Sequence, residues 1–77
     1  MEEEDAIIYL DMINGDQITI TTKDKDFGIT MDAIISIKDA GASLDCSSMS
    51  YFDATCKGDK VWIIDTSHIS SIRVPSS

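Results

Sequence analysis

The segment from Val61 to Val74, VWIIDTSHISSIRV, constrains the fold more than any other part of the chain. It opens with four apolar residues in a row, and such a run bounded by turn residues is typical of a strand buried on both faces. A polar break follows, from Asp65 to His68. The apolar spacing then changes, because Ile69 and Ile72 lie three residues apart and the last apolar residue follows two residues later. This change of period predicts one helical turn that leads into a final strand.

A related arrangement occurs upstream. Residues 31–38, MDAIISIK, follow the same order of residue types as residues 64–73, IDTSHISSIR: an apolar residue, an Asp, a spacer, Ile-x-Ser-Ile and a base. In each segment the Asp carboxylate can accept hydrogen bonds from backbone N–H groups one turn ahead and fix a tight bend. The similarity is either a chance recurrence of a common strand–turn–strand pattern or the trace of a duplicated half-barrel.

Residues 6–22 predict a β-hairpin around Asn14 and Gly15. A two-residue loop would set the apolar face of one strand against the polar face of the other, because a slip of one residue turns every side chain over. A three-residue loop, residues 13–15, aligns the apolar faces and puts Gly15 at the left-handed position of a bulged loop. The pairs predicted by this register are Ile8 with Ile20, Leu10 with Ile18 and Met12 with Asp16.

The remaining segments also favour short strands. Alternating apolar residues predict two strands in residues 27–37, and a further strand is predicted in residues 51–56. Residues 39–50, DAGASLDCSSMS, form the least regular stretch, and we expect a long functional loop there. The domain organisation expected is a disordered acidic tail at residues 1–5, a single domain at residues 6–75 and a short tail at residues 76–77.

The fold class expected is therefore all-β, a small and strongly bent antiparallel barrel of five to seven short strands with one helical turn before the last strand. The leading hairpin, YLDMINGDQITI, and the closing segment, VWIIDTSHISSIRV, resemble the corresponding parts of SH3-like and Sm-like barrels. In those families a single helical turn commonly precedes the last strand. No basic RNA-binding residues of the Sm type can be carried over to this chain.

Charge limits the partners of the chain. It has 77 residues, with 14 acidic and 6 basic side chains and a net charge of −8. Nucleic acids and anionic membranes both attract basic surfaces, so we expect neither as a direct ligand. The chain has no apolar run near the roughly 20 residues of a membrane helix and no basic leader, which predicts a cytoplasmic protein, in the host cytoplasm if the source is viral. A domain of this size has a marginal core, so a homo-oligomer is also considered.

No catalytic or metal-binding pattern emerges from the sequence. His68 is the only histidine, two cysteines are too few for a zinc site, and the carboxylates single out no acid–base pair. We therefore expect a protein that is not an enzyme and has no metal and no cofactor. Trp62 is interpreted first as a core residue and second as an oligomer contact. One of two adjacent aromatic rings must point outward from a strand, so the predicted partner-binding residues are Asp45, Ser47, Ser48, Tyr51, Phe52 and Asp53.

Two functions compete. The first is a non-enzymatic acidic protein that engages and inhibits a host protein with a basic surface; in its small size and acidity the chain resembles phage-encoded inhibitors of bacterial defence or nucleic-acid enzymes. In that case the acids imitate a phosphate backbone, although an acidic surface also simply keeps a small protein dispersed. The second is an Sm-like oligomer that sequesters a small anionic ligand, such as a nucleotide signal, with Ser47, Ser48 and backbone amides.

Overall fold

Antiparallel strands dominate the computed structural model, which describes residues 4–75. Strands account for 46% of the described residues, and within the same range a single α-helix accompanies them. The all-β prediction is therefore right about the dominant element and wrong about the helix. The predicted tails lie outside the described residues except for Glu4 and Asp5, and Asp5 already belongs to the first strand.

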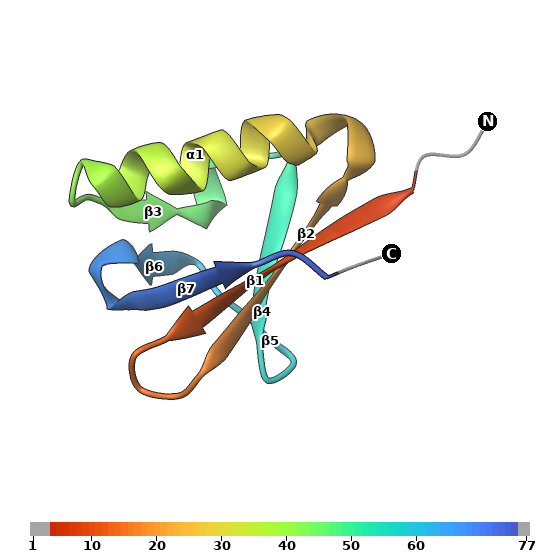
Figure 1. Cartoon of the computed structure of the whole chain (residues 1–77). Coiled ribbons are helices and arrows are strands. Elements are labelled where there is room, and N and C mark those ends of the chain that lie inside the picture. Colours follow the sequence, from red (N-terminus) through yellow and green to blue (C-terminus); the bar gives the residue numbers. More distant parts are fainter. Residues whose placement is uncertain (1–3, 76–77) are drawn as a thin grey trace.

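The strands form two antiparallel sheets, and among residues 4–75 they do not close into a barrel (Figure 1). One sheet has five strands in the order β5-β4-β2-β1-β7, and the other pairs β3 with β6. The helix α1 lies along one side of the structure, next to β3. The strands are β1 (Asp5–Met12), β2 (Gln17–Lys23), β3 (Ser43–Asp45), β4 (Phe52–Cys56), β5 (Asp59–Lys60), β6 (Ile63–Asp65) and β7 (Ile69–Arg73); the helix is α1 (Phe27–Asp39), and the 3-10 turns are η1 (Asp24–Asp26), η2 (Cys46–Ser48) and η3 (Thr66–His68).

The β1–β2 hairpin has the predicted register. Ile8 pairs with Ile20 and Leu10 with Ile18, and the Met12 N–H donates to the Asp16 carbonyl at 2.8 Å. The loop is therefore the three-residue one, with its glycine in the left-handed region at φ 93°. The four paired apolar residues are all buried, so the alternating pattern of the sequence reports the inward face of the sheet.

The two strands predicted in residues 27–37 are wrong, because these residues form α1. Phe27, Met31 and Ile34 are spaced by four and three residues and face the core, whereas Ile29, which the strand pattern also used, is exposed. Helical spacing thus competes with alternation in this stretch, and packing against the sheet decides in favour of the helix. After the helix, Gly41 takes a left-handed φ of 71° and its N–H donates to the Lys38 carbonyl, which ends the helix.

A carboxylate–guanidinium pair joins β7 to β1. Arg73 Nε lies 2.6 Å from Asp11 Oδ2, Arg73 Nη2 lies 3.0 Å from Asp11 Oδ1, and the Ser71 hydroxyl donates to Asp11 at 2.8 Å. The hydrogen bonds from Arg73 and Ser71 lower the pKa of Asp11 from 3.8 to about 2. Asp11 therefore binds protons less readily in the folded chain than in the unfolded chain.

This pair predicts a specific loss of stability in acid. A depressed carboxyl pKa stabilises the fold above the unfolded value of 3.8, and that contribution disappears as the pH falls from about 4 to about 2. Asp11→Asn is expected to lower the urea midpoint at pH 7 and to flatten its dependence on pH between 4 and 2. Urea unfolding of both proteins at several pH values measures the difference, and parallel curves would contradict the role of Asp11.

Candidate functional site

Asp45 organises the start of the predicted partner-binding segment. Its Oδ1 accepts from the Ser47 N–H at 3.0 Å and from the Ser47 hydroxyl at 2.6 Å, and the Ser48 hydroxyl donates to the Asp45 carbonyl at 3.0 Å. The hydrogen bond from the Ser47 hydroxyl is the main cause that lowers the pKa of Asp45. These three polar residues thus bond to one another and shape a turn at the end of β3, a strand that lies inside the predicted loop.

The same turn recurs at the end of β6. Asp65 Oδ1 accepts from the Ser67 N–H at 3.1 Å and from the Ser67 hydroxyl at 2.6 Å. β3 and β6 pair antiparallel through Leu44 and Ile64, so the two turns lie at opposite ends of one small sheet. The internal similarity of the chain therefore joins residues 44–48 to residues 64–68. Residues 31–38 do not form the strand–turn–strand pattern considered for them, because they are helical. The turn predicted before the last strand is confirmed and is η3.

The predicted aromatic pair does not present a free ring. Phe52 is only 5% exposed and belongs to the core. Tyr51 is half-buried; its ring packs edge-on against Phe52 at 5.5 Å, and its hydroxyl lies 3.3 Å from Met49 Sδ. Asp53 alone of these three neighbours is exposed, with a carboxylate oxygen 3.9 Å from Lys60 Nζ. Phe52 is inward because its pairing with Thr22 aligns the inner faces of β4 and β2.

Trp62 lies at the surface, 56% exposed, so its interpretation as a core residue is wrong. Burial of the Val61–Ile64 run on both faces is wrong as well, since Ile63 is 65% exposed and only Ile64 is fully inward. Lys60 Nζ lies 4.6 Å from the centre of the Trp62 ring, a cation–π contact. The role of Trp62 as an oligomer contact stays a prediction.

A hollow of about 220 Å³ lies beside Trp62 and β4. It brings together four of the predicted site residues, Ser47, Phe52, Asp53 and Trp62, whereas Asp45, Ser48 and Tyr51 do not line it. We call it the Trp62 hollow. Its other lining residues are Cys46, Met49, Ser50, Ala54 and Lys60.

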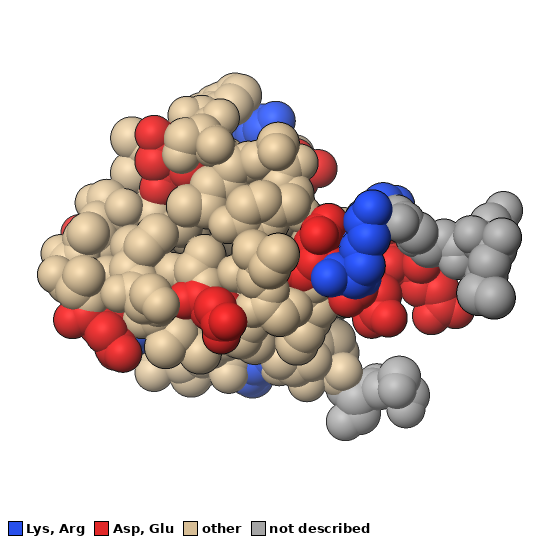
Figure 2. Space-filling model, turned by 90° about the horizontal axis from the view of Figure 1, so that it is seen from above, with Lys and Arg blue, Asp and Glu red and all other residues tan. Residues whose placement is uncertain are grey.

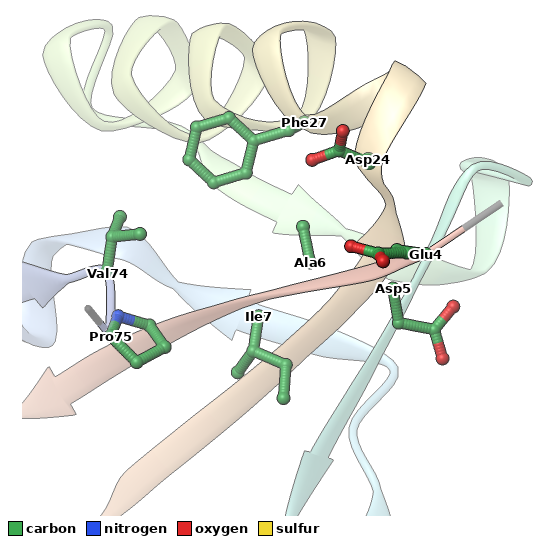
Figure 3. Close-up of a pocket in the computed structure, with 8 residues that line it drawn as sticks. All are labelled: Glu4, Asp5, Ala6, Ile7, Asp24, Phe27, Val74 and Pro75. Carbon is green, nitrogen blue, oxygen red and sulfur yellow. The ribbon is translucent and has the colours of Figure 1, made fainter. Parts of the chain in front are cut away.

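A larger hollow, of about 430 Å³, lies where β1 begins and β7 ends (Figure 3). Its carboxylates come from Glu4, Asp5 and Asp24, and its apolar wall includes the ring of Phe27 at the start of α1. In Figure 3, Ala6 points to the helix side of β1, whereas Asp5 points to the opposite side. We call this hollow the acidic groove. Its remaining lining residues are Ile7, Val74 and Pro75.

The carboxylates of the acidic groove differ in their partners. Asp5 forms an ion pair with Lys23 at 2.8 Å. Within residues 4–75, neither Glu4 nor Asp24 has a side-chain ion-pair partner; the Asp24 N–H donates to the Glu4 carbonyl at 2.8 Å. Sequence reasoning missed this groove because it assigned Glu4 and Asp5 to a frayed tail. The run of acids at the N-terminus was the one signal that pointed to it.

Most of the basic groups are already paired with acids. Ion pairs between residues 4–75 place four bases within 4 Å of a carboxylate oxygen, the two closest pairs being Arg73 with Asp11 and Lys23 with Asp5. Figure 2, the view from above, shows acidic side chains at several separate points between uncharged surface and a group of them beside basic side chains at one end, without one continuous row. On this face the excess negative charge is therefore not arranged as one continuous row. The other two pairs are Lys57 with Asp16 and Lys60 with Asp53.

Among residues 4–75, no three His, Cys, Asp or Glu side chains converge where a metal ion could bind. In the same part of the chain, the one helix lacks the length and apolar character together needed to cross a membrane.

Comparison with known proteins yields no match: no family model, no curated protein and no solved structure is significantly similar to this chain. The resemblances to SH3-like and Sm-like barrels and to phage-encoded inhibitors therefore stay predictions. The class that the structure defines, over residues 4–75, is a small antiparallel β fold with one helix and several surface hollows.

Proposed function

We propose that this chain is a non-enzymatic binding protein that engages a basic surface of a host protein and inhibits it by occupying that surface. The observation that carries the proposal is the charge left after pairing. The chain has a net charge of −8, most of its bases are held by acids, and Glu4 and Asp24 lie beside an apolar wall without an ion-pair partner among residues 4–75. Such a surface attracts a basic partner over long range and can contact it closely at the groove.

The mode of engagement follows from how the acids are distributed. A partner that keeps a basic groove for nucleic acid would lose access to it when an acidic protein fills the groove, as in a phage-type inhibitor. The separate carboxylates of Figure 2 favour discrete contacts with individual Lys and Arg side chains over imitation of an evenly charged phosphate row. We also propose that the fold is related to SH3-like and Sm-like barrels. The β1–β2 hairpin and the turn before β7 support this relation.

The alternative function, sequestration of a small anionic ligand, has no specific observation in its favour. The Ser47 hydroxyl donates to the Asp45 carboxylate and the Ser48 hydroxyl to the Asp45 carbonyl, so both are engaged within the turn. The nearby Asp45 and Asp53 carboxylates would also repel an anion. We therefore retain the protein-binding proposal.

A salt titration with a charge-reduced variant tests this function. The full chain, immobilised as bait at low salt, is expected to retain a basic protein from cell lysate, and the purified partner should bind it in defined stoichiometry. Its affinity should fall as salt screens the charges. A variant that lowers the net charge by four, from −8 to −4, should associate about tenfold more slowly at low salt and should approach the wild-type rate at high salt. The substitutions are Asp24→Asn, Asp32→Asn, Asp39→Asn and Asp59→Asn.

The control for folding is the circular dichroism spectrum of the variant, which should match that of the wild type. Binding that is independent of salt, or a partner without a basic surface, would contradict the proposed function.

A further inference from the structure

Within the described residues 4–75, one stretch of β1 has an open edge. β7 pairs with β1 only from Tyr9 to Met12, whereas β2 pairs with β1 along its length down to Asp5. Residues 5–8 therefore have a strand neighbour on one side, and on the other side the acidic groove lies beside them (Figure 3). An unpaired strand edge offers main-chain donors and acceptors to an added strand.

The direction of the main-chain groups in this stretch can be inferred from the hairpin. The Glu4 carbonyl accepts from Asp24, and Met12 donates to Asp16, so even-numbered residues of β1 direct their N–H and C=O groups toward β2. Odd-numbered residues direct theirs to the opposite side, in agreement with the bond from the Ile13 N–H to the His68 carbonyl at 2.8 Å. Asp5 and Ile7 thus direct their N–H and C=O groups to the open edge.

Pro75 explains why β7 does not cover this edge. Tyr9 pairs with Arg73, and continuing that register by two residues would place Pro75 opposite Ile7. A proline has no N–H to donate to the Ile7 carbonyl, so the ladder cannot continue there. The last strand ends at Arg73, and among residues 4–75 no second strand pairs with the edge from Asp5 to Ile7.

We propose that an extended, basic segment of the partner protein adds to β1 at Asp5–Ile7 and places a Lys or Arg side chain in the acidic groove. This inference rests on the proposed function and assigns its binding site. A partner residue opposite Ala6 would point, like Ala6, to the helix side of the sheet, where Phe27 and Asp24 lie. The Phe27 ring can then contact the aliphatic stem of the cation or its charged head, while Asp24 and Glu4 balance the charge.

The charge of the groove decides which occupant fits. A second copy of this chain carries a net charge of −8 and would meet three carboxylates at the groove, so it is disfavoured by repulsion. A basic strand gains main-chain hydrogen bonds along the edge and charge complementarity at Glu4 and Asp24. The volume of about 430 Å³ accommodates side chains of an extended segment but not a folded domain.

Short synthetic peptides test the proposal on the full chain. The probe is a blocked hexapeptide that alternates threonine and lysine, titrated into the ¹⁵N-labelled protein at low salt. We expect amide shift changes and slower hydrogen exchange at Asp5 and Ile7. A peptide with the same charges whose alternate amides are N-methylated should bind at least tenfold more weakly, because it lacks donors for the edge. A peptide of alternating threonine and glutamate should not bind.

Matched charge variants locate the lysine side chain. Glu4→Gln and Asp24→Asn should each weaken binding of the basic peptide about twofold to fivefold. Asp59→Asn makes the same change of charge on β5, at the opposite edge of the sheet, and should weaken binding less than either groove variant, because only its long-range attraction is lost.

Equal binding of the N-methylated peptide, or protection of amides elsewhere, would overturn strand addition at β1 and leave the proposed function standing. The same holds if a basic partner protein binds with the expected salt dependence while Asp5 and Ile7 are unaffected. Failure of both the peptide and any basic protein to bind would overturn the proposed function as well.

Discussion

Replacing Ile64 by alanine is expected to lower the free energy of unfolding by about 2–5 kcal/mol, whereas the same replacement at Ile63 should change it by no more than about 0.5 kcal/mol. The two residues are neighbours in β6 and differ in exposure, at 1% for Ile64 and 65% for Ile63. Ile64 lies opposite Leu44, which is also fully buried, so its truncation leaves a cavity between the small sheet and the rest of the core. Ile63 faces outward and leaves none.

Urea and thermal unfolding of the two variants measure this contrast. A domain of this length is stable by about 4–12 kcal/mol in total, so Ile64→Ala should unfold near physiological temperature while Ile63→Ala melts like the wild type. Equal destabilisation by both replacements would contradict the register of β6, because a slip of one residue exchanges the inward and outward positions. The pair therefore tests the orientation that exposes Trp62 and Ile63 next to the Trp62 hollow.

Sequence patterns predicted those elements whose geometry is set locally. The β1–β2 hairpin follows from strict alternation and from Gly15, and the turn η3 follows from Asp65 and the spacing after it. The helix was missed because its apolar residues fit both periods: Phe27 and Met31 belong to an alternating row and to a helical stripe. The burial of Thr30 and Ile34 favours the helix over the strand. This burial depends on packing against strands that are distant in the sequence, so the local pattern could not predict it.

The candidate sites were predictable to a smaller extent for the same reason. The bonding of Asp45 with Ser47 and Ser48 is local, and residue types alone indicate it. Whether Phe52 or Trp62 faces water depends on strand pairing; the sequence left open which of Tyr51 and Phe52 points outward, and it placed Trp62 in the core incorrectly. The acidic groove is assembled from the start of β1, the turn η1, the start of α1 and the residues after β7, so no single segment carries its pattern.

The second large effect is expected from two buried threonines that fasten α1 to the sheet. The Thr22 hydroxyl donates to the Tyr51 carbonyl at 2.7 Å, and the Thr30 hydroxyl lies 3.1 Å from Thr22 Oγ1 and 2.8 Å from the Asp26 carbonyl. Both threonines are buried. Thr22→Val keeps the shape but leaves the Tyr51 carbonyl without this donor, and it is expected to lower the free energy of unfolding by about 1–3 kcal/mol. The control, Thr21→Val, lies next to it on the opposite face of β2 and should be close to neutral.

A double-mutant cycle separates this link from simple loss of polarity. Thr30→Val alone should also be destabilising, because it removes the hydroxyl that can donate to Thr22 Oγ1. In each single variant the remaining hydroxyl loses its hydrogen-bond partner, whereas in the double variant neither hydroxyl is present. The free energy of unfolding should therefore fall by at least about 0.5 kcal/mol less in the double variant than the sum of the two single changes. Urea unfolding of the four proteins gives the coupling. Strict additivity would mean that the two hydroxyls act separately, with Thr30 bonded to the helix backbone and Thr22 to the residue before β4. In that case α1 is held to the sheet by apolar packing alone.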